Sequence, residues 1–96
     1  MKVLLKGPDM DAFKEIVVPN ELHTLQELVG GYLEAVTIAE DAAILCNEDG
    51  RLMGLPFNCI WCGQSFVGTI LIVGTMGDEF TDCPWTVEMA NGGIER

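Results

Sequence analysis

The stretch that decides the fold is residues 66–75, Phe66-Val67-Gly68-Thr69-Ile70-Leu71-Ile72-Val73-Gly74-Thr75. It is rich in β-branched residues and carries no charge, which predicts a strand. Its apolar part is the longest in the chain, and this places the strand at the centre of a sheet. The run is broken by Gly68 and Thr69 and is far too short to span a bilayer.

Shorter β-rich runs lie on both sides of this strand in the sequence. Turn residues separate them, and they occupy residues 3–5, 15–18, 32–38, 43–46 and 85–89. Residues 32–38 alternate with a period of two, so that Glu34 and Val36 share one face and Ala35 takes the other.

One helix is predicted between these runs. Thr24 and Glu27 form a capping-box pattern, Leu25 and Val29 fall on one face, and Gly30 ends the helix. Many strands and one helix predict an α+β domain, with an antiparallel or mixed β-sheet and one short helix packed on a face. Residues 1–96 show no internal repeat and no linker, so we expect a single domain.

The second strong feature of the chain is its negative charge. Fifteen acidic residues against five basic ones give a net charge of −10. The span from Glu15 to Asp49 carries eight carboxylates and no Lys or Arg. Such a protein is repelled by nucleic acid and anionic membranes and attracted to basic protein surfaces, although negative charge also serves solubility alone. The candidate partner-binding carboxylates are Glu27, Glu34, Glu40, Asp41, Glu48 and Asp49.

The cysteines predict a structural metal site. Cys59-Ile60-Trp61-Cys62 is a Cys-x-x-Cys followed by Gly63, a pattern typical of half a zinc site. Cys83 lies in a turn and Cys46 ends a strand. The sequence therefore predicts one structural zinc ion held by Cys59, Cys62, Cys83 and Cys46, which staples the fold.

Several alternatives to this zinc site stay open. His23 could replace Cys46 as the fourth ligand, and iron would fit the same four thiolates. The cysteines could also form a redox pair, disulfides, or simply buried thiols that pack as small apolar residues.

An enzyme is not expected from this sequence. The chain has one histidine, no evident nucleophile–base arrangement and no phosphate-binding glycine motif. The apolar segment near Met1 is too short for a signal peptide, so the expected location is the cytoplasm.

Several motifs carry a resemblance to a known family. They are residues 25–34 (LQELVGGYLE), 47–50 (NEDG), 54–58 (GLPFN), 68–69 (GT) and 73–74 (VG). Over about residues 16–80 the chain resembles a small domain of unknown function, common in phages and mobile elements of Gram-positive bacteria. The resemblance implies the α+β fold and no established activity. The cysteines at 59, 62 and 83 depart from the family's pattern, so a zinc site would belong to this member and its close relatives.

A small, acidic, zinc-bearing phage protein is also similar in type to the anti-CRISPR inhibitors of Cas9 from streptococcal phages. That resemblance implies a mechanism in the cytoplasm of the infected bacterial host. The acidic domain would dock on a basic lobe of Cas9 and block loading of target DNA. The alternatives are sequestration of a small nucleotide signal, or a non-enzymatic interaction module of a mobile element.

Overall fold

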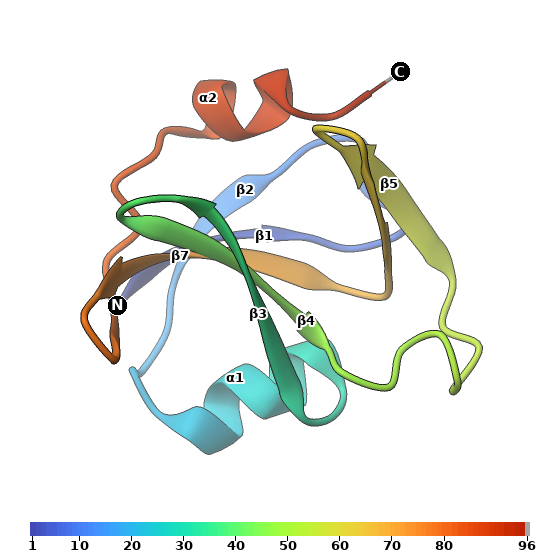
Figure 1. Ribbon diagram of the computed structural model, residues 1–96, viewed down its shortest axis with the longest axis horizontal. Helices are drawn as coiled ribbons and strands as arrows, with labels where there is room; N and C mark the ends of the chain where they lie inside the picture. Colours follow the sequence, from blue (N-terminus) through green and yellow to red (C-terminus); the bar gives the residue numbers. More distant parts are fainter. Residues whose placement is uncertain (96) are drawn as a thin grey trace.

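An antiparallel sheet forms the centre of the computed structural model, which describes residues 1–95 (Figure 1). The strands lie in the order β2-β1-β7-β4-β3, and β8 pairs with β7 beyond the end of β1. Their bounds are β1 (Lys2–Lys6), β2 (Lys14–Val17), β3 (Leu33–Ala39), β4 (Ala42–Asn47), β7 (Ile70–Met76) and β8 (Glu79–Thr81).

Strand β7 is central, as its apolar sequence predicts. It pairs with β4 along one edge and with β1 and β8 along the other. Every residue from Ile70 to Gly74 is buried, because the sheet is covered on both faces at this strand. Phe66 belongs to a separate strand, since Gly68 adopts a positive φ of 71° and turns the chain before β7 begins.

Helix α1 (Leu22–Val29) covers one face of the sheet. Its Leu25 and Val29 pack against side chains of β1, β4 and β7. The predicted capping box is wrong, because the helix begins earlier and Thr24 lies inside it. Gly30 ends the helix as predicted, with a left-handed φ of 82° and its N–H bonded to the carbonyl of Gln26.

The opposite face is covered by a hairpin and a second helix (Figure 1). The hairpin consists of β5 (Phe57–Trp61) and β6 (Gln64–Val67), and the helix is α2 (Val87–Gly92). Trp61 joins them, since its indole Nε1 donates to the carbonyl of Ala90 at 2.8 Å and its ring lies 5.7 Å from that of Trp85.

A buried polar contact ties the hairpin to β1. Lys6 is 3% exposed, and its Nζ donates to Asn58 Oδ1 at 2.7 Å. Asn58 Nδ2 donates in turn to the carbonyls of Lys6 and Gly68, at 2.8 and 2.7 Å. Because these buried groups satisfy one another, the contact fixes where β5 crosses the sheet.

The predicted fold class needs correction. The domain is mostly antiparallel β-sheet with two short helices, and within residues 1–95 no group of metal-ligating side chains comes together to form the predicted zinc staple. The strand predicted over residues 85–89 is also wrong. There the hydroxyl of Thr86 accepts from the N–H of Met89 and begins α2 instead.

At Gly74, β7 packs closely against the end of β8 and the segment that follows it, and a substitution there tests this contact. A Cβ at this position would collide with the carbonyl oxygen of Asp82 and the hydroxyl of Thr81. We expect Gly74→Ala to lower the free energy of unfolding by about 1–3 kcal/mol, as overpacked sites do. Urea unfolding at equilibrium would measure the change.

Gly92→Ala is the matched control, because nothing lies within 4 Å of a Cβ built at Gly92. It should leave stability unchanged or slightly raised. Equal stability of the two variants would contradict the described contact between β7 and Asp82.

Candidate functional site

Cys59 and Cys62 lie in different environments of the β5–β6 hairpin. Cys59 is buried in β5, whereas Cys62 is exposed in the turn. Cys62 and Gly63 have φ values of 45° and 85° and form a two-residue turn between Trp61 and Gln64. A turn with two positive φ angles connects the strands tightly, so the Cys-x-x-Cys spacing is that of a two-residue hairpin turn.

The other cysteines do not complete a metal site. Cys46 lies in β4 with its Sγ 3.7 Å from the carbonyl of Glu34, and the Cys83 Sγ lies 3.9 Å from the carbonyl of Trp85. Across the described residues, no three His, Cys, Asp or Glu side chains come together as metal ligands. The structure therefore does not bring Cys59, Cys62, Cys83 and Cys46 together as one group of ligands.

His23, the reserve ligand, lies on α1. It is exposed, and its Nε2 is 3.3 Å from a carboxylate oxygen of Glu21. The helix packs on the face of the sheet opposite to the one that buries the cysteines.

Three of the thiols pack as small apolar residues in the core, which was one of the alternatives for them. Burial raises the pKa of Cys46 to about 11, and the nearby Glu34 carboxylate acts in the same direction. Burial also raises the pKa of Cys59 and of Cys83. A thiol held protonated in the core is a poor nucleophile.

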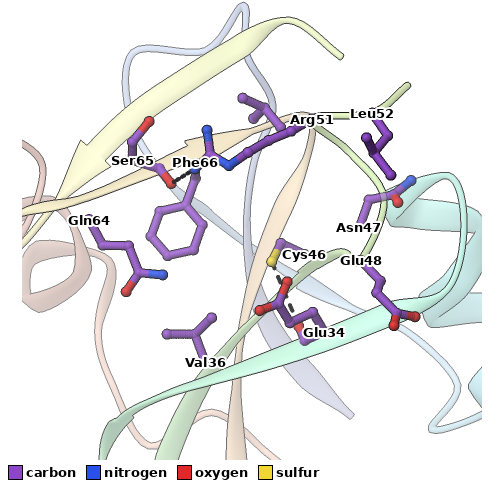
Figure 2. Close-up of a pocket in the computed structure, with 11 residues that line it drawn as sticks. Glu34, Val36, Cys46, Asn47, Glu48, Arg51, Leu52, Gln64, Ser65 and Phe66 are labelled. Carbon is purple, nitrogen blue, oxygen red and sulfur yellow. Dashed lines mark hydrogen bonds between the residues drawn. The ribbon is translucent and has the colours of Figure 1, made fainter. Parts of the chain in front are cut away.

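A cavity lies between β3 and the hairpin (Figure 2). It has a volume of about 410 Å³. Val36 reaches in from β3 and Phe66 from β6, and Cys46 lies to their side, next to Glu34. Glu34 and Glu48 lie along its side toward β3 and the end of β4.

Arg51 is the one basic side chain that lines this cavity. Its Nη2 donates to the carbonyl of Ser65 in β6 at 2.7 Å, which holds the guanidinium against the hairpin. The two carboxylates outnumber this single cation, so the cavity favours positive groups over anions.

The structure places most of the candidate carboxylates around the β3–β4 hairpin. Glu34 lies in β3, Glu40 and Asp41 form the turn, and Glu48 and Asp49 follow β4. All five are exposed.

The remaining candidate, Glu27, is exposed on α1. It lies two residues from both Leu25 and Val29, which face the sheet, so it points away from them.

Sequence reasoning missed the groove-facing residues of the hairpin, Gln64, Ser65 and Phe66. The predicted central strand over residues 66–75 included Phe66, and Gln64 and Ser65 directly preceded it, so nothing indicated that these residues oppose β3. The alternation over residues 32–38 did indicate that Glu34 and Val36 share a face, and the structure confirms this.

Together these features define a small, three-layered antiparallel β-domain with an acidic groove between an edge strand and a hairpin. Residues 1–90 match the family described as a domain of unknown function (DUF3846), and the chain belongs to this family. No curated protein and no solved structure matches the chain. None of the helices within residues 1–95 has the length and apolar character to cross a membrane.

Thiol reactivity tests the placement of the cysteines. At about pH 8 we expect iodoacetamide to modify Cys62 quickly, because its side chain is exposed, and Cys46, Cys59 and Cys83 only after unfolding. Mass spectrometry after peptide digestion would identify the modified residues. Cys62→Ser should abolish the fast phase, and rapid modification of Cys59 in the native protein would contradict the placement.

Alkaline stability tests the burial of Cys46. Its thiol is neutral in the native protein up to about pH 11, while in the unfolded chain it ionises near 9.0. The unfolded state therefore loses protons first, and stability is full below pH 9 and falls as the pH rises toward 11. We expect Cys46 to contribute up to about 2 kcal/mol of this loss, measured by urea unfolding at each pH.

Cys46→Val separates this effect from that of the other groups of the chain. The variant should lose part of the downward slope above pH 9. Superimposable pH profiles of the variant and the wild-type protein would refute the assignment.

Proposed function

We propose that this domain is a non-enzymatic protein-binding domain that docks its acidic β3–β4 side on a basic surface of another protein. The observation that carries the proposal is the group of five exposed carboxylates around the β3–β4 hairpin. Between Lys14 and Arg96, Arg51 is the single Lys or Arg in the sequence, so little positive charge opposes this group.

The physical basis of the proposal is electrostatic steering. A concentrated negative surface accelerates encounter with a basic partner and disfavours acidic partners and nucleic acids. Because the carboxylates are exposed, salt should screen their contribution. The proposed partner is therefore a protein with a basic surface, and neither a nucleic acid nor a membrane.

The partner proposed first is Cas9 of the bacterial host. Cas9 holds its guide–target duplex in a positively charged channel, and an acidic domain bound there would block loading of target DNA. The domain would act as a phage-encoded inhibitor of bacterial defence in the cytoplasm of the infected host. What supports this part of the proposal is charge complementarity and the resemblance in type to anti-CRISPR proteins.

Sequestration of a nucleotide signal receives less support. A nucleotide phosphate would have to enter a cavity that carries Glu34 and Glu48, and Arg51 is already bonded to Ser65 there. Like charges in a partly enclosed site oppose binding.

The experiment measures binding to a basic partner and its dependence on the β3–β4 carboxylates. Cas9, with and without guide RNA, would be titrated with the domain at about 0.05 M and about 0.5 M salt. In one variant the five hairpin carboxylates become amides: Glu34, Glu40, Asp41, Glu48 and Asp49. We expect this variant to bind at least about tenfold more weakly and with a smaller salt dependence.

A second variant controls for net charge. It neutralises five exposed carboxylates elsewhere on the domain, namely Glu21, Glu27, Asp78, Glu79 and Glu88. Both variants then carry a net charge of −5 in place of −10. We expect it to retain affinity within about threefold. Equal losses would refute the assignment to the β3–β4 side. A lack of binding to Cas9 would refute that partner. If the domain also bound no basic protein purified from host lysate, the proposed function would be refuted.

A further inference from the structure

The outer edge of β3 is an open strand edge. β3 is the last strand in the sheet order, and within the described part of the chain no strand pairs with it on the side away from β4. At seven residues it is as long as β7. Alternate residues of an edge strand direct their N–H and C=O groups outward, so β3 presents a row of backbone donors and acceptors.

The hairpin strand β6 stands opposite this edge with an outward-facing carbonyl of its own. Trp61 and Gln64 flank the two-residue turn and form the first pair of the hairpin. Pairs alternate in an antiparallel ladder, so the next pair, Ile60 and Ser65, directs its backbone groups outward. In agreement, the Ser65 carbonyl accepts from Arg51 and not from β5.

Two cavities between these strands form one groove. The larger one, of about 410 Å³, and a second one of about 210 Å³ share Val36, Gln64 and Phe66. The second cavity continues along β3 to Ile38 and along the hairpin to Trp61. The groove therefore follows β3 lengthwise, with Val36 and Phe66 as its apolar floor.

Negative charge marks both ends of this groove. Glu34 and Glu48 lie at the end near Arg51. Glu40 and Asp41 lie in the turn beyond the other end of β3. An occupant would complement the groove if it placed apolar side chains on Val36 and Phe66 and basic side chains at its ends.

We propose that the groove binds an extended basic segment of a partner protein, which pairs with β3 as an additional strand. The inference rests on the proposed function and names the place and manner of binding. Backbone hydrogen bonds along β3 supply affinity, and the alternating side chains supply specificity. A strand that matches the seven residues of β3 spans about 24 Å, at about 3.4 Å per residue.

A second copy of this chain is a poorer occupant of the same edge. Pairing two β3 strands would bring Glu34 and the turn carboxylates of both copies together, and each copy carries −10. Like charges across a strand pair are destabilising.

The probe for this proposal is a seven-residue peptide of alternating lysine and valine with blocked ends. It would be titrated into the isotope-labelled domain and followed by NMR. We expect the largest amide shifts in residues 33–39 and 64–67, and cross-strand proton contacts between the peptide and β3. A peptide of the same sequence with N-methylated backbone should bind at least about tenfold more weakly, because it cannot donate to the strand.

Two single substitutions on β3 form a matched pair. Val36→Lys places an ammonium group in the groove, whereas Ala35→Lys adds the same charge on the other face of the same strand. We expect at least about a tenfold loss of peptide affinity in the first and less than about a threefold change in the second. Glu34→Lys, at an exposed position, repeats the test if Val36→Lys does not fold.

The outcomes separate this inference from the proposed function. Peptide shifts on α1 or β2, or equal losses in the Val36 and Ala35 variants, would overturn the inference. If the basic protein partner binds through the β3–β4 carboxylates and Val36→Lys leaves that affinity unchanged, the proposed function stands and strand addition fails. A dimer of the wild-type protein in sedimentation that Val36→Lys abolishes would also overturn the inference, because the occupant of the groove would then be a second copy of the chain and not a basic segment of a partner.

Discussion

The rest of the structure depends on one constraint: β7 must be paired on both edges and covered on both faces. Its sequence offers apolar side chains in both directions, with Ile72 facing one core and Leu71 the other. A sheet with one covered face would leave half of these side chains in water, at about 25 cal/mol for each Å² of apolar surface. The domain therefore needs a layer on each side, and α1 and the hairpin with α2 supply them.

The two layers are attached by different kinds of contact. α1 binds mainly through apolar packing, with one buried hydrogen bond from Asn47 Nδ2 in β4 to the carbonyl of Val29 at 3.2 Å, and its N-cap residue Glu21 makes no side-chain capping bond. The hairpin binds through Trp61 and through the buried pair of Lys6 and Asn58. Polar contacts of this kind have directional requirements, so they define where the hairpin lies over the sheet. The distance of β6 from β3, and hence the groove, follows from that position.

Local sequence patterns predict the parts of this structure that local physics controls. The apolar run identifies β7, and the glycine after Val29 identifies the end of α1. Patterns fail where long-range packing decides. Residues 85–89 contain Trp, Thr and Val, which favour strands, yet the Thr86 cap and the contact with Trp61 select a helix. The cysteine spacing fits a hairpin turn as well as a metal site, and the register of β5 on β6, which the spacing does not show, leaves Cys59 buried in the strand and Cys62 exposed in the turn. The groove depends on the same register. The sequence therefore indicated the carboxylates that line the groove, but it did not indicate that the β5–β6 hairpin forms one of its walls.

The position of the two tryptophans has a spectroscopic consequence. Trp61 and Trp85 are the only tryptophans in the chain, and both belong to the layer formed by the hairpin and α2. Intrinsic tryptophan fluorescence therefore reports the docking of that layer on the sheet, and it does not report the docking of α1. Far-ultraviolet circular dichroism reports helix and sheet on both sides. Two unfolding curves that coincide would show that the layers detach together, whereas an earlier fluorescence transition would reveal a state in which the hairpin has left and the sheet still holds its helix.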